Sequence, residues 1–346
     1  MRGYLLLIAI FISTLLLIAC NNDPLQHVDV SGIHVPFSSG RLDLDMKNAD
    51  FSNPAATSQT LYHKYGSFYC AYLEDILRVG PCSMDSGFIV MKEFVEDRYV
   101  SEEFKAIEAV HGQKIPGYDA ALEDGLRHWN YYFPDSLVPR VVYFNSAFNA
   151  SIYSTDTVIG IALDFYLGRK HEIVQSLDPE LFPKYVQDNM DPEYLVSDAV
   201  KDWVYRKTNR YAPIAGEGTL LDMIIYTGKV MYVLDAMLPE VPDSIKINWS
   251  AGEMNWAQQS EGNIWKNLAT QDNLFNRSSF DNQKWLINGP FTNVDGIPQD
   301  APPQLGIWMG WQFVRAYMKE YPATTLIELL QEQNTNKILK SYSPPR

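Results

Sequence analysis

The sequence predicts a mostly helical α+β fold, arranged as a single compact unit with one small antiparallel sheet. Apolar residues recur at helical spacing through most of the chain. Short β-branched and aromatic runs, typical of strands, gather in one place, between residues 139 and 165. No Gly/Ser-rich or Pro-rich linker is long enough to divide the chain into independent domains.

Three helices are expected before the sheet. In residues 58–79, apolar side chains at helical spacing form one face. Shorter amphipathic stretches predict helices over 101–111 and 118–132, and Pro134 ends the second. The runs RVVYFNSAF, SIYST and TVIGIALDF follow and are separated by Asn and Asp, so they predict two or three strands.

Helices return after the strands. Residues 191–193, Asp-Pro-Glu, supply an N-cap, a first-turn proline and an early acidic residue. Two Ser/Thr-x-x-Glu segments, at 250–253 and 325–328, have the form of a capping box. The run at 219–238 is apolar on nearly every side, which is typical of a buried helix. These signals predict helices over 192–206, 219–238, 251–270, 305–320 and 324–335.

The first residues predict export. Arg2 precedes an apolar run that ends in Leu17-Ile18-Ala19-Cys20, the form of a lipoprotein signal. The alternative is an uncleaved membrane anchor, but the run has only about 16 apolar residues where a membrane span needs about 20. We therefore expect a signal peptide at 1–19, attachment to the lipid bilayer through acylated Cys20, a tether and extended lead-in at 20–57, and a folded domain at 58–346.

Charge narrows the classes of partner. The formal net charge is −14, and loss of Arg2 with the signal peptide makes it −15. An acidic surface repels nucleic acid and anionic lipid headgroups. We expect no nucleic-acid partner, and a membrane attachment that depends on the lipid.

Cysteines and histidines give little sign of a metal site. Cys70 and Cys82 lie twelve residues apart in a chain that we expect to be exported. A disulfide that closes a helix onto the following loop and a pair of buried thiols both fit this spacing. The six histidines include no pair at H-x-x-H or H-x₃-H spacing, so we expect no metal and no cofactor.

One segment comes close to a zinc motif. Residues 171–175 read His-Glu-Ile-Val-Gln, one substitution away from H-E-x-x-H. Gln is a poor zinc ligand and the segment follows an expected loop, so we interpret the match as an accident. No P-loop, dinucleotide fingerprint or G-x-S-x-G elbow occurs.

One pair of acidic residues has helical spacing. Asp198 and Asp202 lie one turn apart on the expected helix at 192–206. They fit either a glycosidase carboxylate pair or a solvated helix face on which Asp202 pairs with Arg206. We expect the solvated face.

Several segments, taken in order, resemble one family. The lipobox, Ile159–Gly168 (IGIALDFYLG), the apolar run at 219–238 and Gly306–Trp311 (GIWMGW) resemble the gliding-motility lipoprotein GldB family over nearly the whole mature chain. The resemblance implies a membrane-anchored lipoprotein of the gram-negative cell envelope, which acts in gliding beside other envelope proteins. It implies no secure enzymatic activity.

The order of segments also resembles, more weakly, the gluzincin-type zinc peptidases. That comparison puts Asp198 and Asp202 where the first two metal ligands belong and Ala199 where the catalytic Glu belongs. Thr227 stands where a later helix would supply the third ligand. The implied fold is a degenerate peptidase, because a zinc peptidase needs three ligands and a base.

We therefore expect a non-catalytic scaffold or assembly partner of the gliding apparatus, at the periplasmic face of the membrane or at the outer membrane. The alternative is a lipid-anchored glycan-binding or glycan-processing protein, which exposed aromatic side chains beside paired carboxylates would favour.

The segment from residue 159 to His171 is a candidate functional surface that includes Asp164, Tyr166 and Gly168. Asp164 interrupts an apolar run at the end of a strand, and a charge there needs a partner or an exposed role. Capping of the following loop by Asp164 is the other interpretation.

Overall fold

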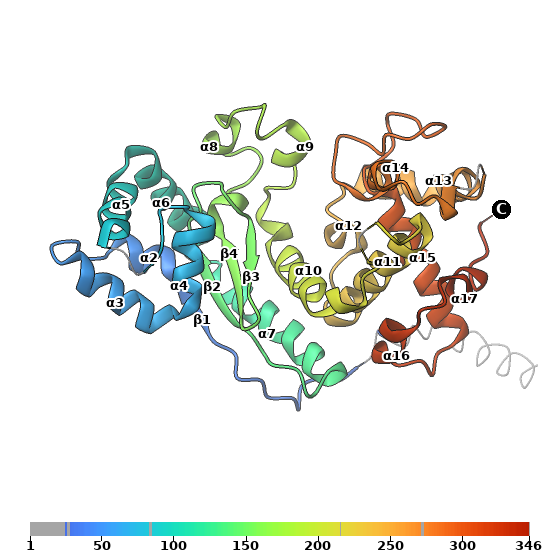
Figure 1. Cartoon of the computed structure of the whole chain (residues 1–346), viewed down its shortest axis with the longest axis horizontal. Coiled ribbons are helices and arrows are strands. Elements are labelled where there is room, and N and C mark those ends of the chain that lie inside the picture. The colour runs from blue at the N-terminus through green and yellow to red at the C-terminus, as the bar shows by residue number, and fades with distance from the viewer. Residues whose placement is uncertain (1–24, 26–27, 83–84, 215, 271–272, 346) are drawn as a thin grey trace, which may run out of the picture.

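A four-stranded sheet lies between two groups of helices in the computed structural model (Figure 1), which describes residues 25, 28–82, 85–214, 216–270 and 273–345. The prediction of a mostly helical α+β fold is confirmed. The first elements are β1 (Ser39–Arg41), α2 (Leu42–Lys47), α3 (Pro54–Tyr65), α4 (Ser67–Ala71), the π-helix η1 (Tyr72–Ile76), α5 (Asp85–Glu96), α6 (Arg98–His111) and α7 (Ile115–Tyr132).

The remaining strands follow α7, and helices complete the chain. They are β2 (Arg140–Phe144), β3 (Ile152–Ser154), β4 (Val158–Ala162), the 3₁₀-helix η2 (Leu163–Tyr166), α8 (Glu172–Gln175), α9 (Lys184–Gln187), η3 (Pro192–Tyr194), α10 (Leu195–Thr208), η4 (Asn209–Tyr211), α11 (Leu220–Met237), α12 (Asp243–Lys246), α13 (Ala251–Ala269), η5 (Asn273–Phe275), α14 (Ser279–Leu286), α15 (Leu305–Glu320), α16 (Leu326–Gln331) and α17 (Thr335–Lys340).

The sheet is mixed, so the prediction of an antiparallel sheet was wrong. Its strand order is β1-β2-β4-β3. β2 pairs in parallel with both β1 and β4, and only β3 runs antiparallel to its neighbour. Helix α10 packs against both β3 and β4.

The segment before residue 58 is more structured than the expected extended lead-in. It supplies β1, which pairs with β2, and α2, whose Leu42 and Met46 are fully buried. Helix α3 begins at Pro54 and ends before Gly66. The backbone of Gly66 has a φ of 62°, a value that residues other than glycine rarely adopt. The single helix expected over 58–79 is therefore broken at Gly66 into α3, α4 and η1.

The sheet divides the buried core into two clusters, because successive side chains of a strand point to opposite faces. Val141 and Tyr143 of β2 pack with α7, α10 and α11, whereas Val142 and Phe144 pack with the helices α2–α6. Gly160 of β4 belongs to the second face, and a Cβ at this position would lie 2.5 Å from the ring of Phe68. The glycine therefore allows an aromatic side chain of α4 to lie directly on the sheet.

A close crossing of two glycines joins α11 to α15. A Cβ at Gly228 would lie 2.2 Å from the carbonyl oxygen of Gly310. A Cβ at Gly310 would lie 1.9 Å from the carbonyl oxygen of Ile224. Both obstructing atoms are backbone atoms, so no side-chain rotation relieves the clash, and only glycine fits at either position.

Buried charges fix the same two helices to α12. Asp235 of α11 accepts hydrogen bonds from Lys246 Nζ at 2.8 Å, Trp311 Nε1 at 2.7 Å and Arg315 Nε at 2.9 Å. Arg315 also donates two hydrogen bonds to Asp243, at 2.6 and 2.8 Å. Because these charges are paired and hydrogen-bonded, they are tolerated in the interior.

Candidate functional site

The candidate site is a cleft above the first turns of α10. Two adjoining cavities of about 240 and 440 Å³ share Asn189, Asn248 and Asn288 as lining residues. Residues of α9 and its flanking segment line one side, and the connections before α13 and α15 line the other. Figure 1 shows where these elements lie in the fold. We call this space the α10 cleft.

Asp198 lies at the base of the α10 cleft and is held by donors from three elements. Tyr166 donates its hydroxyl to Oδ2 at 3.1 Å, and Asn248 Nδ2 donates to Oδ1 at 2.9 Å. Lys201 Nζ forms an ion pair with Oδ1 at 3.0 Å and also donates to the Asn248 side-chain oxygen. These contacts fix the orientation of the Asp198 side chain.

Asp202 faces a different space. It lines a separate cavity with Tyr205 and Arg206, whereas Asp198 lines the α10 cleft. Burial raises the pKa of Asp202, although hydrogen bonding to Ser154 and the Arg206 charge oppose this shift. Arg206 does not form the expected ion pair with Asp202 and instead pairs with Asp156 at 2.9 Å.

The two carboxylates are therefore neither on a solvated face, as we expected, nor across one groove from each other. Asp198 and Asp202 are both partly buried. Glycosidase carboxylates must flank the same bond. Asp198 and Asp202 instead line two different cavities.

Asp164, expected at a functional surface, is fully buried. It accepts hydrogen bonds from the Ser146 backbone at 3.0 Å, the Ser146 hydroxyl at 2.8 Å and the Phe148 backbone at 2.6 Å. Ala147 and Phe148 have φ of 49° and 58°, so the carboxylate stabilises a turn with left-handed residues. Asp164 thus caps the loop after β2, and not the loop that follows Asp164 itself. Burial raises its pKa to about 6.

The rest of the predicted surface reaches the α10 cleft only in part. Tyr166 is buried, and its hydroxyl donates a hydrogen bond to Asp198 at the base of the cleft. Gly168 has a φ of 108° and forms a turn in the backbone. A hydrogen bond from the Arg169 backbone N–H to the Asp191 carboxylate, at 2.7 Å, stabilises this turn. His171 is the N-cap of α8 and does not line either cavity of the cleft.

The segment that resembles a zinc motif is one turn of helix. His171 Nδ1 accepts a hydrogen bond from the Ile173 backbone, which is a capping role. Gln175 donates its side-chain amide to the carbonyl oxygen of Arg169. Thr227, at the position of the third ligand in the peptidase comparison, donates to carbonyls of its own helix, Met223 and Ile224.

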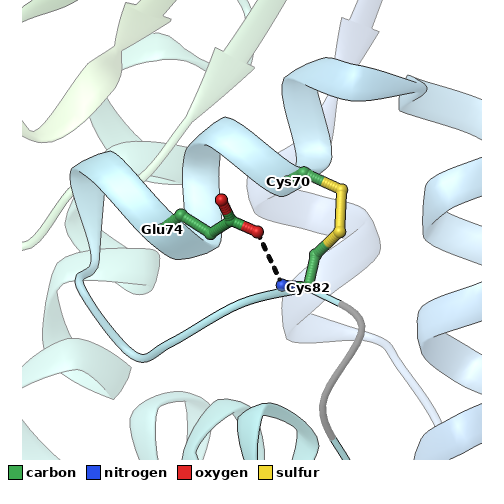
Figure 2. Close-up of side chains that lie close together, drawn as sticks. All are labelled: Cys70, Glu74 and Cys82. Carbon is green, nitrogen blue, oxygen red and sulfur yellow. Dashed lines mark hydrogen bonds between the residues drawn. A yellow bond between two sulfur atoms is a disulfide. The ribbon is translucent and has the colours of Figure 1, made fainter.

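Cys70 and Cys82 form a disulfide in the structure, with their Cα atoms 5.0 Å apart. Figure 2 shows the Glu74 carboxylate beside it, accepting the backbone N–H of Cys82 at 2.8 Å. The two sulfur atoms and the carboxylate lie within 4.8 Å of one another. Because the sulfurs are bonded to each other, they offer no thiolate to a metal in this state.

Sequence reasoning missed the residues that shape the cleft most directly. Lys201, Asn248 and Gln304 belong to no motif, and they come from α10, the turn before α13 and the residue before α15. Asn248 and Gln304 have φ of 59° and 61°. Asn tolerates this conformation and could have indicated a turn, whereas Gln304 gives no such signal.

Residues 23–344 match the family described as gliding motility protein GldB. The chain belongs to this family. Comparison with curated proteins and with solved structures gave no match. The protein is therefore a member of a gliding-motility lipoprotein family, as the resemblance in the sequence implied.

Cys20 and the signal segment lie outside the residues that the structure describes. Within the described part of the chain, no helix combines the length and the apolar character needed to cross a bilayer.

Proposed function

We propose that this protein is a lipid-anchored, non-catalytic scaffold or assembly partner in the gliding machinery of the cell envelope. The family match over residues 23–344 carries the proposal. Acylation of Cys20 would hold the domain at the periplasmic face of the membrane or at the outer membrane. Two acyl chains give stable attachment where one is marginal.

Three features support a role in binding over a role in catalysis. Both oxygens of Asp198 are occupied by donors from Tyr166, Asn248 and Lys201. Asp202 lines a cavity other than the one that Asp198 lines. Thr227 offers its hydroxyl to its own helix.

The tryptophans also bear on the alternative of glycan processing. No tryptophan of the described chain is among the exposed large side chains, and six are buried: Trp129, Trp203, Trp249, Trp285, Trp308 and Trp311. A row of exposed tryptophans or tyrosines beside paired carboxylates would have favoured glycan processing. The scaffold is the better account.

Isolation of the protein with its neighbours tests the scaffold. The wild-type chain with a C-terminal tag is cross-linked in cells and purified from membranes. The control joins residues 1–27 to an unrelated soluble domain, so that it has the same predicted anchor. We expect envelope proteins required for gliding to accompany only the wild-type chain. Identical sets of co-purified proteins would contradict the proposal.

A single substitution tests whether the chain is non-catalytic. Asp202→Asn keeps the size of the side chain and removes the charge. We expect cells with this variant to spread at the wild-type rate. Loss of spreading by a folded, correctly anchored variant would point to chemistry at this carboxylate.

A further inference from the structure

The charges that line the α10 cleft balance, although the protein as a whole is strongly acidic. Three basic and three acidic residues line its two cavities, while the whole chain carries −14. Lys201 pairs with Asp198, Lys184 pairs with Asp188, and Arg169 pairs with Asp191 just outside the lining. A cleft with paired charges has little attraction for an ionic ligand.

Amide side chains supply much of the remaining polar lining. Asn189, Asn248, Asn288 and Gln304 come from four separate segments and meet in this cleft. The side chains of Asn189 and Gln304 form no hydrogen bond within the described part of the chain, so their donors and acceptors are available. Each amide presents one acceptor and two donors side by side.

The amides are held on a fixed frame. Asn248 donates to Asp198 and accepts from Lys201, which fixes its orientation. Asn248 and Gln304 both have left-handed backbone conformations, and strained residues of this kind gather at ligand sites. The cavities, about 240 and 440 Å³, fall in or near the range of ligand pockets, roughly 300–1,000 Å³.

We propose that the α10 cleft binds an uncharged carbohydrate. Sugar hydroxyls both donate and accept hydrogen bonds, so they match primary amides better than ions do. The partly buried ring of Tyr185 lines the larger cavity and offers a face on which a sugar can stack. An extended peptide is a poorer fit, because no residue of a strand lines either cavity, so the cleft offers no sheet edge to which a peptide strand could add.

This inference is independent of the proposed scaffold role, because it rests on the cleft alone. Binding is measured by isothermal titration calorimetry on the mature lipidated protein in detergent. Chitotetraose, cellotetraose and maltotetraose are the neutral probes, and tetragalacturonate and tetra-alanine are the charged and peptide comparisons. We expect at least one neutral tetrasaccharide to bind and neither comparison to do so.

Two variants connect the binding to the amides. Asn189→Ala and Gln304→Ala each remove one amide, and each should weaken binding of that tetrasaccharide about tenfold, the value of one hydrogen bond of about 1.4 kcal/mol. Gln258→Ala is the matched control, because it removes an exposed amide of α13 outside the cleft. All variants must retain the wild-type circular dichroism spectrum, and a variant that unfolds is replaced by Gln304→Glu or Asn189→Asp.

Three results would overturn the proposal. One is the absence of binding by every neutral tetrasaccharide. Another is tighter binding of tetragalacturonate or the peptide. The third is binding that Asn189→Ala and Gln304→Ala leave as strong as in the Gln258→Ala control.

Discussion

Substitution of Gly310 by alanine tests the crossing of α11 and α15 on which the second half of the fold depends. The new Cβ would lie 1.9 Å from the carbonyl oxygen of Ile224, whereas ordinary contact begins at 3.4 Å. The helices would have to separate by roughly 1.5 Å, because both groups belong to the backbone. That movement would also disturb the buried contacts of Asp235 with Trp311 and Arg315.

The size of the effect follows from this geometry. Overpacking of a core costs about 1–3 kcal/mol and sometimes more. The helix propensity of alanine returns only about 1 kcal/mol. We expect the free energy of unfolding to fall by about 2 kcal/mol for Gly310→Ala, and the melting temperature to fall by about 3 °C.

Gly117 provides a matched control. It lies in α7, and a Cβ there would meet no atom within 4 Å. Gly117→Ala should therefore raise stability by about 0.5–1 kcal/mol. Urea unfolding followed by circular dichroism measures both variants. A Gly310→Ala protein within about 0.5 kcal/mol of wild type would refute the reasoning.

Three further predictions concern charges and the disulfide. Asp235→Asn should lower the free energy of unfolding by about 3–5 kcal/mol in urea titrations, because the buried Lys246 ammonium loses the carboxylate with which it pairs. Burial and a neighbouring carboxylate raise the pKa of Glu103 to about 7, so its ionisation opposes folding as the pH rises from about 4 to 7. Glu103→Gln should therefore unfold at higher urea than wild type at pH 8, and this advantage should disappear at pH 4. Replacement of both Cys70 and Cys82 by alanine should cost about 2–3 kcal/mol, as should reduction of the wild type, because the bond closes a loop of twelve residues. Equal stability with and without reductant would contradict this last prediction.

Local signals predicted the helices of the second half well. The capping boxes expected at 250–253 and 325–328 both form, and α10 and α11 begin within about three residues of the predicted positions. Caps and apolar periodicity act over a few residues, so one sequence is enough to recognise them.

The sheet was predicted less completely because strand pairing is not a local property. β1 has only three residues, Ser39–Arg41, and no β-branched side chain, yet it pairs with β2 about a hundred residues later. Parallel pairing of β2 with β4 likewise depends on the connection that contains β3. Neither pairing can be recognised from the sequence of the strand itself.

The cleft could not be predicted for a related reason. Asn189, Asn248 and Gln304 lie far apart in the sequence, and each is an ordinary polar residue in its own segment. Asp164 shows the opposite case, since its charge attracted attention but its partners, Ser146 and Phe148, make it a buried cap. Only the fold brings the three amides together in the cleft and buries Asp164 away from the surface.

Restoration of gliding by an anchored and a non-anchored chain tests the central claim most directly. Cells that lack the protein are supplied with the wild-type chain or with Cys20→Ser, and the rate of colony spreading is measured. We predict that the wild-type chain restores spreading and that Cys20→Ser, present at the same level, does not. Equal restoration by the two chains would contradict a function that requires the lipid anchor.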